Sequence, residues 1–296
     1  MLLRTKPHSL CLALALIALS TLSAHAHVTV LSGLSNSHTV QPGQSITGAI
    51  TVKNHSTEGV EVVLTQNDYF FDVEEGTRYP EADSLPRSNA GWLQPESGRV
   101  LLEPGETRPL NYSITVPEDS DLVGTFWSVI MVEPDTDGRF DPAVDQGELT
   151  GPRMGIQTKI RYGIQIVTNI GTTGQSDISF RDRELIRDNG TVLLQVDLQN
   201  TGERMTRPVL WAEIYAEDGE KLKRIQGRRL RMYPETSVRH RFNLTELDKG
   251  IYHVLVIVDD DGEDVFAARY RIDLSDHKKI PSSQPPAEEQ TDNPSD

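Results

Sequence analysis

Short runs of alternating apolar and polar residues recur through most of this 296-residue chain, separated by clusters of Gly, Pro, Asn and Asp. Examples are SITGAITVKN, GVEVVLTQND, TVLLQVDLQN and VFAARYRIDL, whereas helical periodicity is rare between residues 27 and 275. Alternation with a period of two is typical of a strand with one buried face, and many such runs at this spacing indicate a β-sandwich or barrel. We therefore predict an all-β protein.

The two halves of the chain repeat the same order of signals. Each has a strand that ends at Asn, then a turn led by Pro, then a strand that starts with Gly: Asn54, Pro104 and Gly124 in the first half, and Asn200, Pro234 and Gly250 in the second. Such a repeat indicates two copies of one sandwich topology. The small polar stretch GTTGQS at 171–176 separates them, so we predict tandem immunoglobulin-like β-sandwich domains at 27–170 and 171–275.

The two ends of the chain have compositions of their own. Arg4 and Lys6 precede the apolar run LCLALALIALSTL, and Ala24-His25-Ala26 has the form of a cleavage site, so residues 1–26 are predicted to be a signal peptide. We expect a periplasmic protein, with secretion or cell-surface display as alternatives, and no transmembrane segment in the mature chain. Residues 276–296 are proline-rich and acidic, which predicts a disordered tail.

Composition and motifs narrow the classes of function. The formal net charge of −15 argues against binding to nucleic acid or to anionic lipid. The sole cysteine, Cys11, lies in the predicted signal peptide, and the histidines are scattered. No G-x-S-x-G elbow, G-x-G-x-x-G or P-loop occurs, so we predict no catalytic residues, no cofactor and no enzymatic activity.

Three groups of polar residues nevertheless merit a functional interpretation. The acidic loop 135–145 has oxygen ligands that suit Ca²⁺, although it lacks the spacing of a known calcium loop; the Asp-Gly cluster at 259–264 is more typical of a hairpin turn. His27, at the predicted mature N-terminus, is a possible copper ligand with His38 or His55 as the second histidine. Eight Lys and Arg residues between 221 and 241 form a basic face, which we interpret mainly as cross-strand pairing with Asp and Glu.

One predicted strand is unusually long. From Gly155 to Thr168 the chain reads GIQTKIRYGIQIVT, in which Ile, Thr or Tyr occupies every second position. Strands of 5–6 residues are usual. We predict a strand over 154–168 that closes the first domain and extends beyond what its own sandwich requires.

The sequence around this strand resembles the periplasmic pilus-assembly chaperones of the PapD-like family. The matching features, mainly in the first domain, are the turn Leu102-Glu103-Pro104-Gly105, the pair Phe126-Trp127, the strand end Val132-Glu133-Pro134, and the stretch Gln157-Thr158-Lys159-Ile160-Arg161. In that family the long last strand pairs with an incomplete immunoglobulin-like subunit. One feature of the family is missing, because no Arg or Lys occurs between Val28 and Val40, where the family has a second cation.

The resemblance implies site residues and partners. Met154 and Ile156 fall where the family inserts apolar side chains into the subunit, and Arg161 falls where it grips the subunit's C-terminal carboxylate, with Lys159 on the same strand. We therefore expect a non-catalytic, chaperone-like protein that pairs strand 154–168 with protein subunits of a surface structure. The alternative is a structural or cell-surface interaction protein built of tandem modules, and a copper-binding protein that uses His27 is a further one.

Overall fold

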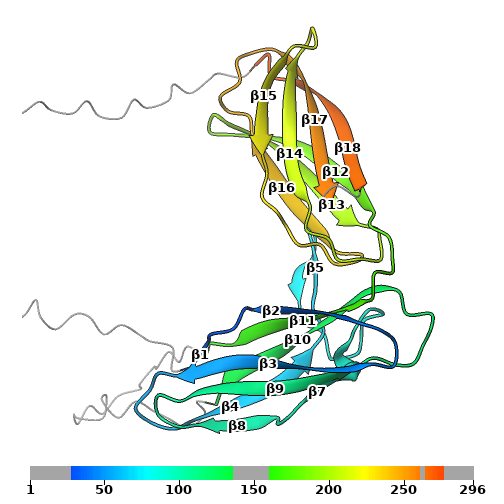
Figure 1. Ribbon diagram of the computed structural model, residues 1–296. Helices are drawn as coiled ribbons and strands as arrows, with labels where there is room; N and C mark the ends of the chain where they lie inside the picture. Colours follow the sequence, from blue (N-terminus) through cyan, green and yellow to red (C-terminus); the bar gives the residue numbers. More distant parts are fainter. Residues whose placement is uncertain (1–27, 136–159, 261–263, 277–296) are drawn as a thin grey trace, which may run out of the picture.

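The computed structural model describes residues 28–135, 160–260 and 264–276, which form two β-sandwiches inclined steeply to one another (Figure 1). Several predictions concern residues outside these ranges: the signal peptide, His27, most of the acidic loop 135–145, Met154, Ile156, Lys159 and the tail after residue 276. No helix in the described ranges is long and apolar enough to span a membrane.

The N-terminal sandwich consists of two sheets. The first has the order β1 (Val28–Val30), β3 (Ser45–Asn54), β9 (Thr107–Thr115) and β7 (Leu93–Pro95). The second has the order β2 (Ser35–Val40), β11 (Tyr162–Ile170), β10 (Gly124–Pro134), β4 (Val60–Asn67) and β8 (Arg99–Leu102). The consecutive strands β1 and β2 lie in different sheets, as do β7 and β8, so the chain crosses between the sheets at both places.

The C-terminal sandwich has seven strands in the described residues. One sheet has the order β12 (Ile178–Asp188), β13 (Thr191–Asn200) and β16 (Ser237–Asn243). The other has the order β15 (Lys221–Gln226), β14 (Val209–Ala216), β17 (Ile251–Asp260) and β18 (Asp264–Asp273). Three strands facing four in this order is the immunoglobulin-like arrangement. The prediction of two tandem immunoglobulin-like sandwiches is confirmed, and its residue limits stay predictions.

A buried asparagine ends β3 in the N-terminal sandwich and β13 in the C-terminal one, and it fixes the turn beside each strand. Asn54 Nδ2 donates to the carbonyls of Glu58 (2.8 Å) and Leu102 (3.1 Å), among others. Asn200 Nδ2 donates in the same way to the carbonyls of Arg204 (2.7 Å) and Met232 (3.0 Å). Both side chains are fully buried. The repeat in the sequence therefore corresponds to the same hydrogen-bonded corner built twice.

A long excursion between β4 and β7 packs against the second sheet of the N-terminal sandwich. It contains the hairpin β5 (Phe70–Asp72) and β6 (Gly76–Arg78) and the short 3₁₀ helix η1 (Ala90–Trp92). The buried carboxylate of Asp68 holds its base by accepting hydrogen bonds from the backbone N–H groups of Ser84 (2.8 Å) and Leu85 (2.7 Å) and from Ser88 Oγ. Every residue of β10 from Gly124 to Val132 is buried, so this central strand is covered on both faces.

The predicted strand over 154–168 has a different start and end in the structure. Residues 160 and 161 precede β11, which begins at Tyr162 and continues to Ile170. In the register of β10 and β11, Val132 is opposite Tyr162, so Pro134 would face Ile160. Proline has no N–H for the ladder, which accounts for the later start. Residues 154–159 lie outside the described ranges.

Candidate partner-binding face

The first half of β11 is paired with a neighbouring strand along only one of its two edges in the described residues. Tyr162, Gly163 and Ile164 pair with β10, whereas the parallel partner β2 begins opposite Gln165 and follows β11 from there to Ile170. Among the described residues no strand pairs with the other edge of 162–164. A partly unpaired strand edge is where an extended segment of another chain can add itself to a sheet.

Exposed apolar side chains surround this free edge. Ile160, just before β11, is 43% exposed, and Leu34, whose carbonyl accepts the hydrogen bond from Gln165 N–H (2.9 Å), is 54% exposed. The ring of Tyr79, itself half-exposed, reaches over Gly163, where a Cβ would lie 3.9 Å from it. Large exposed apolar side chains gathered at one unpaired edge favour contact with a protein partner.

Arg161 lies beside the free edge and is bound to the neighbouring strand. Its Nε donates to Glu133 at 2.5 Å, and its side chain is 56% exposed. The structure thus places this predicted carboxylate-binding residue near β11 but engaged with an acidic residue. Its role in partner binding stays a prediction, as do those of Met154, Ile156 and Lys159.

The second half of β11 meets the C-terminal sandwich in an aromatic seam. Tyr233 is fully buried and stacks on Trp127 of β10, with ring centroids 4.7 Å apart and planes inclined by 16°. Tyr69 meets Tyr233 edge-on at 6.2 Å, and its carbonyl accepts a hydrogen bond from Trp127 Nε1 at 2.6 Å. Tyr79 stacks in turn on Tyr69, so an aromatic row leads from the buried seam to the free edge of β11.

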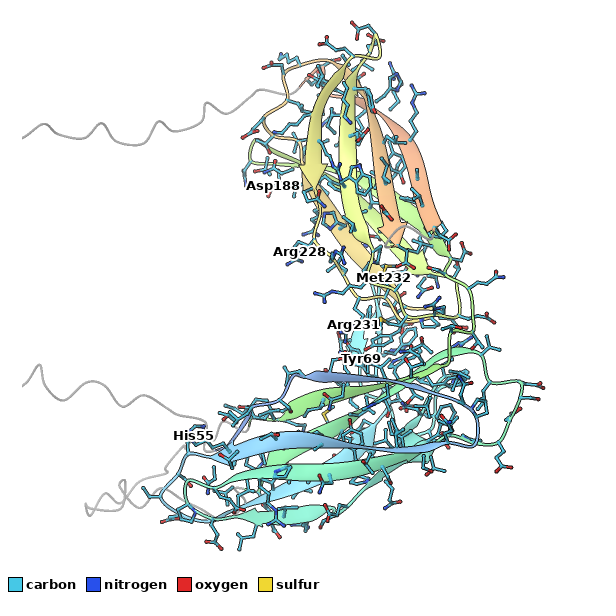
Figure 2. All side chains as sticks on the ribbon, in the orientation of Figure 1. His55, Tyr69, Asp188, Arg228, Arg231 and Met232 are labelled. Atoms are coloured by element: carbon cyan, nitrogen blue, oxygen red, sulfur yellow. The ribbon has the colours of Figure 1, made fainter. Side chains whose placement is uncertain are left out.

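Arg231 of the C-terminal sandwich enters this seam from the loop between β15 and β16. Its Nη1 donates to Gln165 Oε1 of β11 (2.9 Å) and to Ser35 Oγ of β2. Tyr233 OH also donates to Gln165 Oε1, at 2.8 Å. Figure 2 shows Arg231 beside Tyr69 where the two sandwiches meet, with Arg228 farther along the same side of the C-terminal sandwich.

Arg231 has an unusual electrostatic setting. No acidic side chain in the described parts of the chain forms an ion pair with it, although the protein carries 44 acidic residues and 29 Lys and Arg. Burial raises the pKa of Tyr69 to about 12 and also raises the pKa of Tyr233, so both phenols are neutral at physiological pH. The half-buried guanidinium therefore has neutral oxygen partners here and no compensating anion.

A carboxylate fixes the other side of the seam. Asp72, at the end of β5, accepts hydrogen bonds from Ser237 Oγ (2.5 Å) and from Arg181 Nη1 (2.9 Å), both in the C-terminal sandwich. The Ser237 hydroxyl is the main cause of the lowered pKa of Asp72. Because hairpin β5–β6 belongs to the N-terminal sandwich, this contact helps to set the angle between the two sandwiches.

Three other basic side chains of the predicted basic face form ion pairs with Asp or Glu, as expected. Arg239 forms a bidentate pair with the buried Asp197 (2.8 and 2.6 Å), and Lys221 and Lys223 pair with Glu213 and Glu246. Arg241 donates to Gln195 at 2.9 Å. Arg231 also departs from the predicted pairing with Asp and Glu, and nothing in its local sequence indicates its position in the seam.

Metal ligands are not clustered in the described part of the chain, where no group of three or more His, Cys, Asp or Glu side chains could hold an ion. His38 Nε2 lies 2.9 Å from Tyr112 OH, and His55 Nε2 lies 2.8 Å from Thr29 Oγ1. The copper hypothesis depends on His27, which lies outside the described residues. The calcium hypothesis depends on the loop 135–145, of which Asp135 alone is described.

Known proteins similar to this chain were found among solved structures. No protein-family model matches the chain, and no curated protein matches it. The class 5 fimbriae chaperone CfaA is 12% identical, with a TM-score of 0.43, over 82% of this chain and 98% of that one. The Escherichia coli chaperone DraB is 13% identical, with a TM-score of 0.37, over 81% and 96%.

A third match is a chaperone–subunit complex. The CsuC–CsuE complex from archaic Csu pili of Acinetobacter baumannii is 12% identical, with a TM-score of 0.39, over 71% of this chain and 89% of that one.

Proposed function

We propose that this protein is a non-catalytic, chaperone-like protein of the periplasm that binds subunits of a surface structure. The observation that supports the proposal is the free edge of β11 at Tyr162–Ile164, with exposed Ile160, Leu34 and Tyr79 around it. An extended segment of a subunit adds its main chain to this edge and packs alternate apolar side chains beside it. Met154, Ile156 and Lys159 are proposed to prolong the same binding strand.

We assign Arg231 to the anionic end of the subunit. Its Nη1 is engaged by Gln165 and Ser35, while Nε and Nη2 have no partner among the described residues and remain for a bidentate carboxylate contact. A C-terminal carboxylate suits this arrangement because it ends an extended segment that lies along β11. Arg161 lies just before β11, about 13 Å from Gln165 at four residues of extended chain, and would contact the bound segment nearer its middle.

Co-purification from the periplasm tests the strand-pairing step. We expect Ile160→Asp to remove a co-purifying subunit, because it places a charge at the free edge, whereas folding should hardly change since Ile160 is exposed. The matched control is Leu101→Asp. Leu101 is a similarly exposed apolar residue on β8, at the opposite edge of the same sheet. If both variants retain the same partners as the parent, the free edge is not the binding site.

The anchor is tested separately. Arg231→Gln should weaken binding of a purified subunit by a factor of about ten or more, the scale of one charge-assisted contact. Amidation of the subunit's C-terminus should weaken binding to the parent equally and have little further effect on the variant. Full sensitivity of the variant to amidation would place the carboxylate elsewhere.

A second candidate function is a structural, cell-surface interaction module. It is favoured by the edge strands of the C-terminal sandwich, where Lys221, Lys223 and Arg224 line β15 and Arg269 and Arg271 line β18, since charged edges prevent strand addition. In such a module Ile160→Asp would be neutral.

A further inference from the structure

The sheet of the C-terminal sandwich that contains β14 and β17 has an apolar patch in the middle of its outer face, with the carboxylates of Glu213 and Asp259 beside it. Trp211, Ile257 and Ala267 stand opposite one another in a row across β14, β17 and β18. Leu255 follows on β17, and Val265 on β18 is 63% exposed. None of these five side chains belongs to a core cluster of the described residues. We call this surface the C-terminal outer face.

Cationic groups frame this face in an otherwise acidic chain. The Arg224 guanidinium lies over the Trp211 ring, 4.1 Å from its centroid. Arg269 stands opposite Leu255, and Arg271 stands opposite His253 on the neighbouring strand. Aromatic and aliphatic side chains bordered by guanidinium groups suit a ligand that is both apolar and acidic.

The indole nitrogen of Trp211 is buried beneath this face. Its Nε1 is buried and has no hydrogen-bond partner of ordinary geometry in the described parts of the chain. The indole lies near enough to Glu213 to contribute, last among the causes, to the lowered pKa of that carboxyl, which Lys221 and Tyr215 dominate.

We propose that the chain's own C-terminal segment, residues 281–296, docks on the C-terminal outer face. Its sequence is PSSQPPAEEQTDNPSD, with four prolines, four acidic residues and no Lys or Arg. Proline-rich segments adopt the polyproline II conformation and bind aromatic surfaces. Pro285 and Pro286 pack on Trp211 and Ile257, and Glu288 and Glu289 meet Arg224 and Arg269.

The position of β18 makes this docking geometrically possible. β18 ends at Asp273, six residues along the strand from Ala267, and β18 and β14 are two strand spacings apart. The path from the end of β18 to Trp211 is therefore about 22 Å, from about 20 Å along the strand and about 10 Å across it. The nine residues from Asp276 to Pro285 span about 28 Å as polyproline II, which is sufficient. Attachment to the same chain also supplies an effective concentration of the order of millimolar.

Paramagnetic relaxation enhancement on the mature protein tests the proposal. The sole cysteine lies in the predicted signal peptide, so Ser283→Cys gives one site for a nitroxide label. We expect broadening of the Trp211 indole resonance and of the Ile257 and Ala267 amides at low salt, and at least a twofold weaker effect in 0.5 M NaCl. Broadening that is absent, or spread evenly over both sandwiches, would overturn the proposal.

Two variants and one mixing experiment complete the test. Arg224→Gln, at an exposed side chain, and the pair Glu288→Gln with Glu289→Gln should each reduce the broadening at least twofold without shifting core resonances. Unchanged broadening in both would refute the proposed charge contacts. Mixing spin-labelled unenriched protein with unlabelled ¹⁵N protein should give no broadening; if it does, the occupant is the tail of a second copy and docking within one chain is wrong.

Discussion

Removal of the Tyr233 ring should uncouple the two sandwiches. The side chain is fully buried, its ring stacks on Trp127 at 4.7 Å, and its hydroxyl donates to Gln165 at 2.8 Å. A large buried aromatic side chain replaced by Ala typically costs about 3–5 kcal/mol, of which the stacked pair contributes about 0.5–1.5 kcal/mol. Since Tyr233 lies outside both sandwich cores, most of this loss should fall on the contact between them.

Urea unfolding followed by circular dichroism measures this effect. We expect Tyr233→Ala to give two transitions in place of one, and Trp127, 4% exposed in the parent, to show a red-shifted emission. The control is Tyr215→Ala, at a tyrosine on β14 outside the seam, which should leave cooperativity unchanged. A single transition in Tyr233→Ala, with an unfolding free energy within about 1 kcal/mol of the parent, would refute the reasoning.

Three further predictions concern the corners and the seam. Asn54→Ala and Asn200→Ala should each lower the free energy of unfolding by about 2–3 kcal/mol in chemical denaturation, because each leaves buried carbonyls without donors; a loss in one alone would contradict the equivalence of the corners. The folded-state pKa of Asp72 is lowered, so its stabilisation is present above the unfolded-state pKa and is lost as pH falls through the folded-state value; Asp72→Asn should flatten this part of the acid-unfolding curve. Gly124→Ala should lower the melting temperature by several degrees, since φ is +79° and a Cβ would clash with the carbonyl oxygen of Glu203 in the second sandwich. An unchanged melting temperature would contradict this expectation.

The sequence was sufficient for the fold class and for the repeat. Alternation in runs such as β3 and β13 reflects burial on one face, a local property that the chain carries without reference to distant residues. The buried amides of Asn54 and Asn200 end these two strands in the same way, so the spacing of the Asn and Pro signals was informative.

The site was less predictable, because it depends on distant partners. Alternation continues through Ile160, yet β11 begins at Tyr162, because Ile160 would stand opposite Pro134 of the neighbouring strand β10. Likewise, nothing in the local sequence around Arg231 indicates that its loop returns to the seam. The contact between Arg231 and Ser35 joins residues far apart in the chain. It places the Arg231 guanidinium beside the segment 28–40, which has no Arg or Lys of its own.

The pairing of β2 with β11 also has a consequence for the order of folding. Ser35 is opposite Gln165, 130 residues later, and the two strands run parallel. Closing a flexible loop of that length costs about 4 kcal/mol in chain entropy before the pairing repays it, and such distant contacts slow folding. The N-terminal sandwich is therefore completed only after most of its chain has been made.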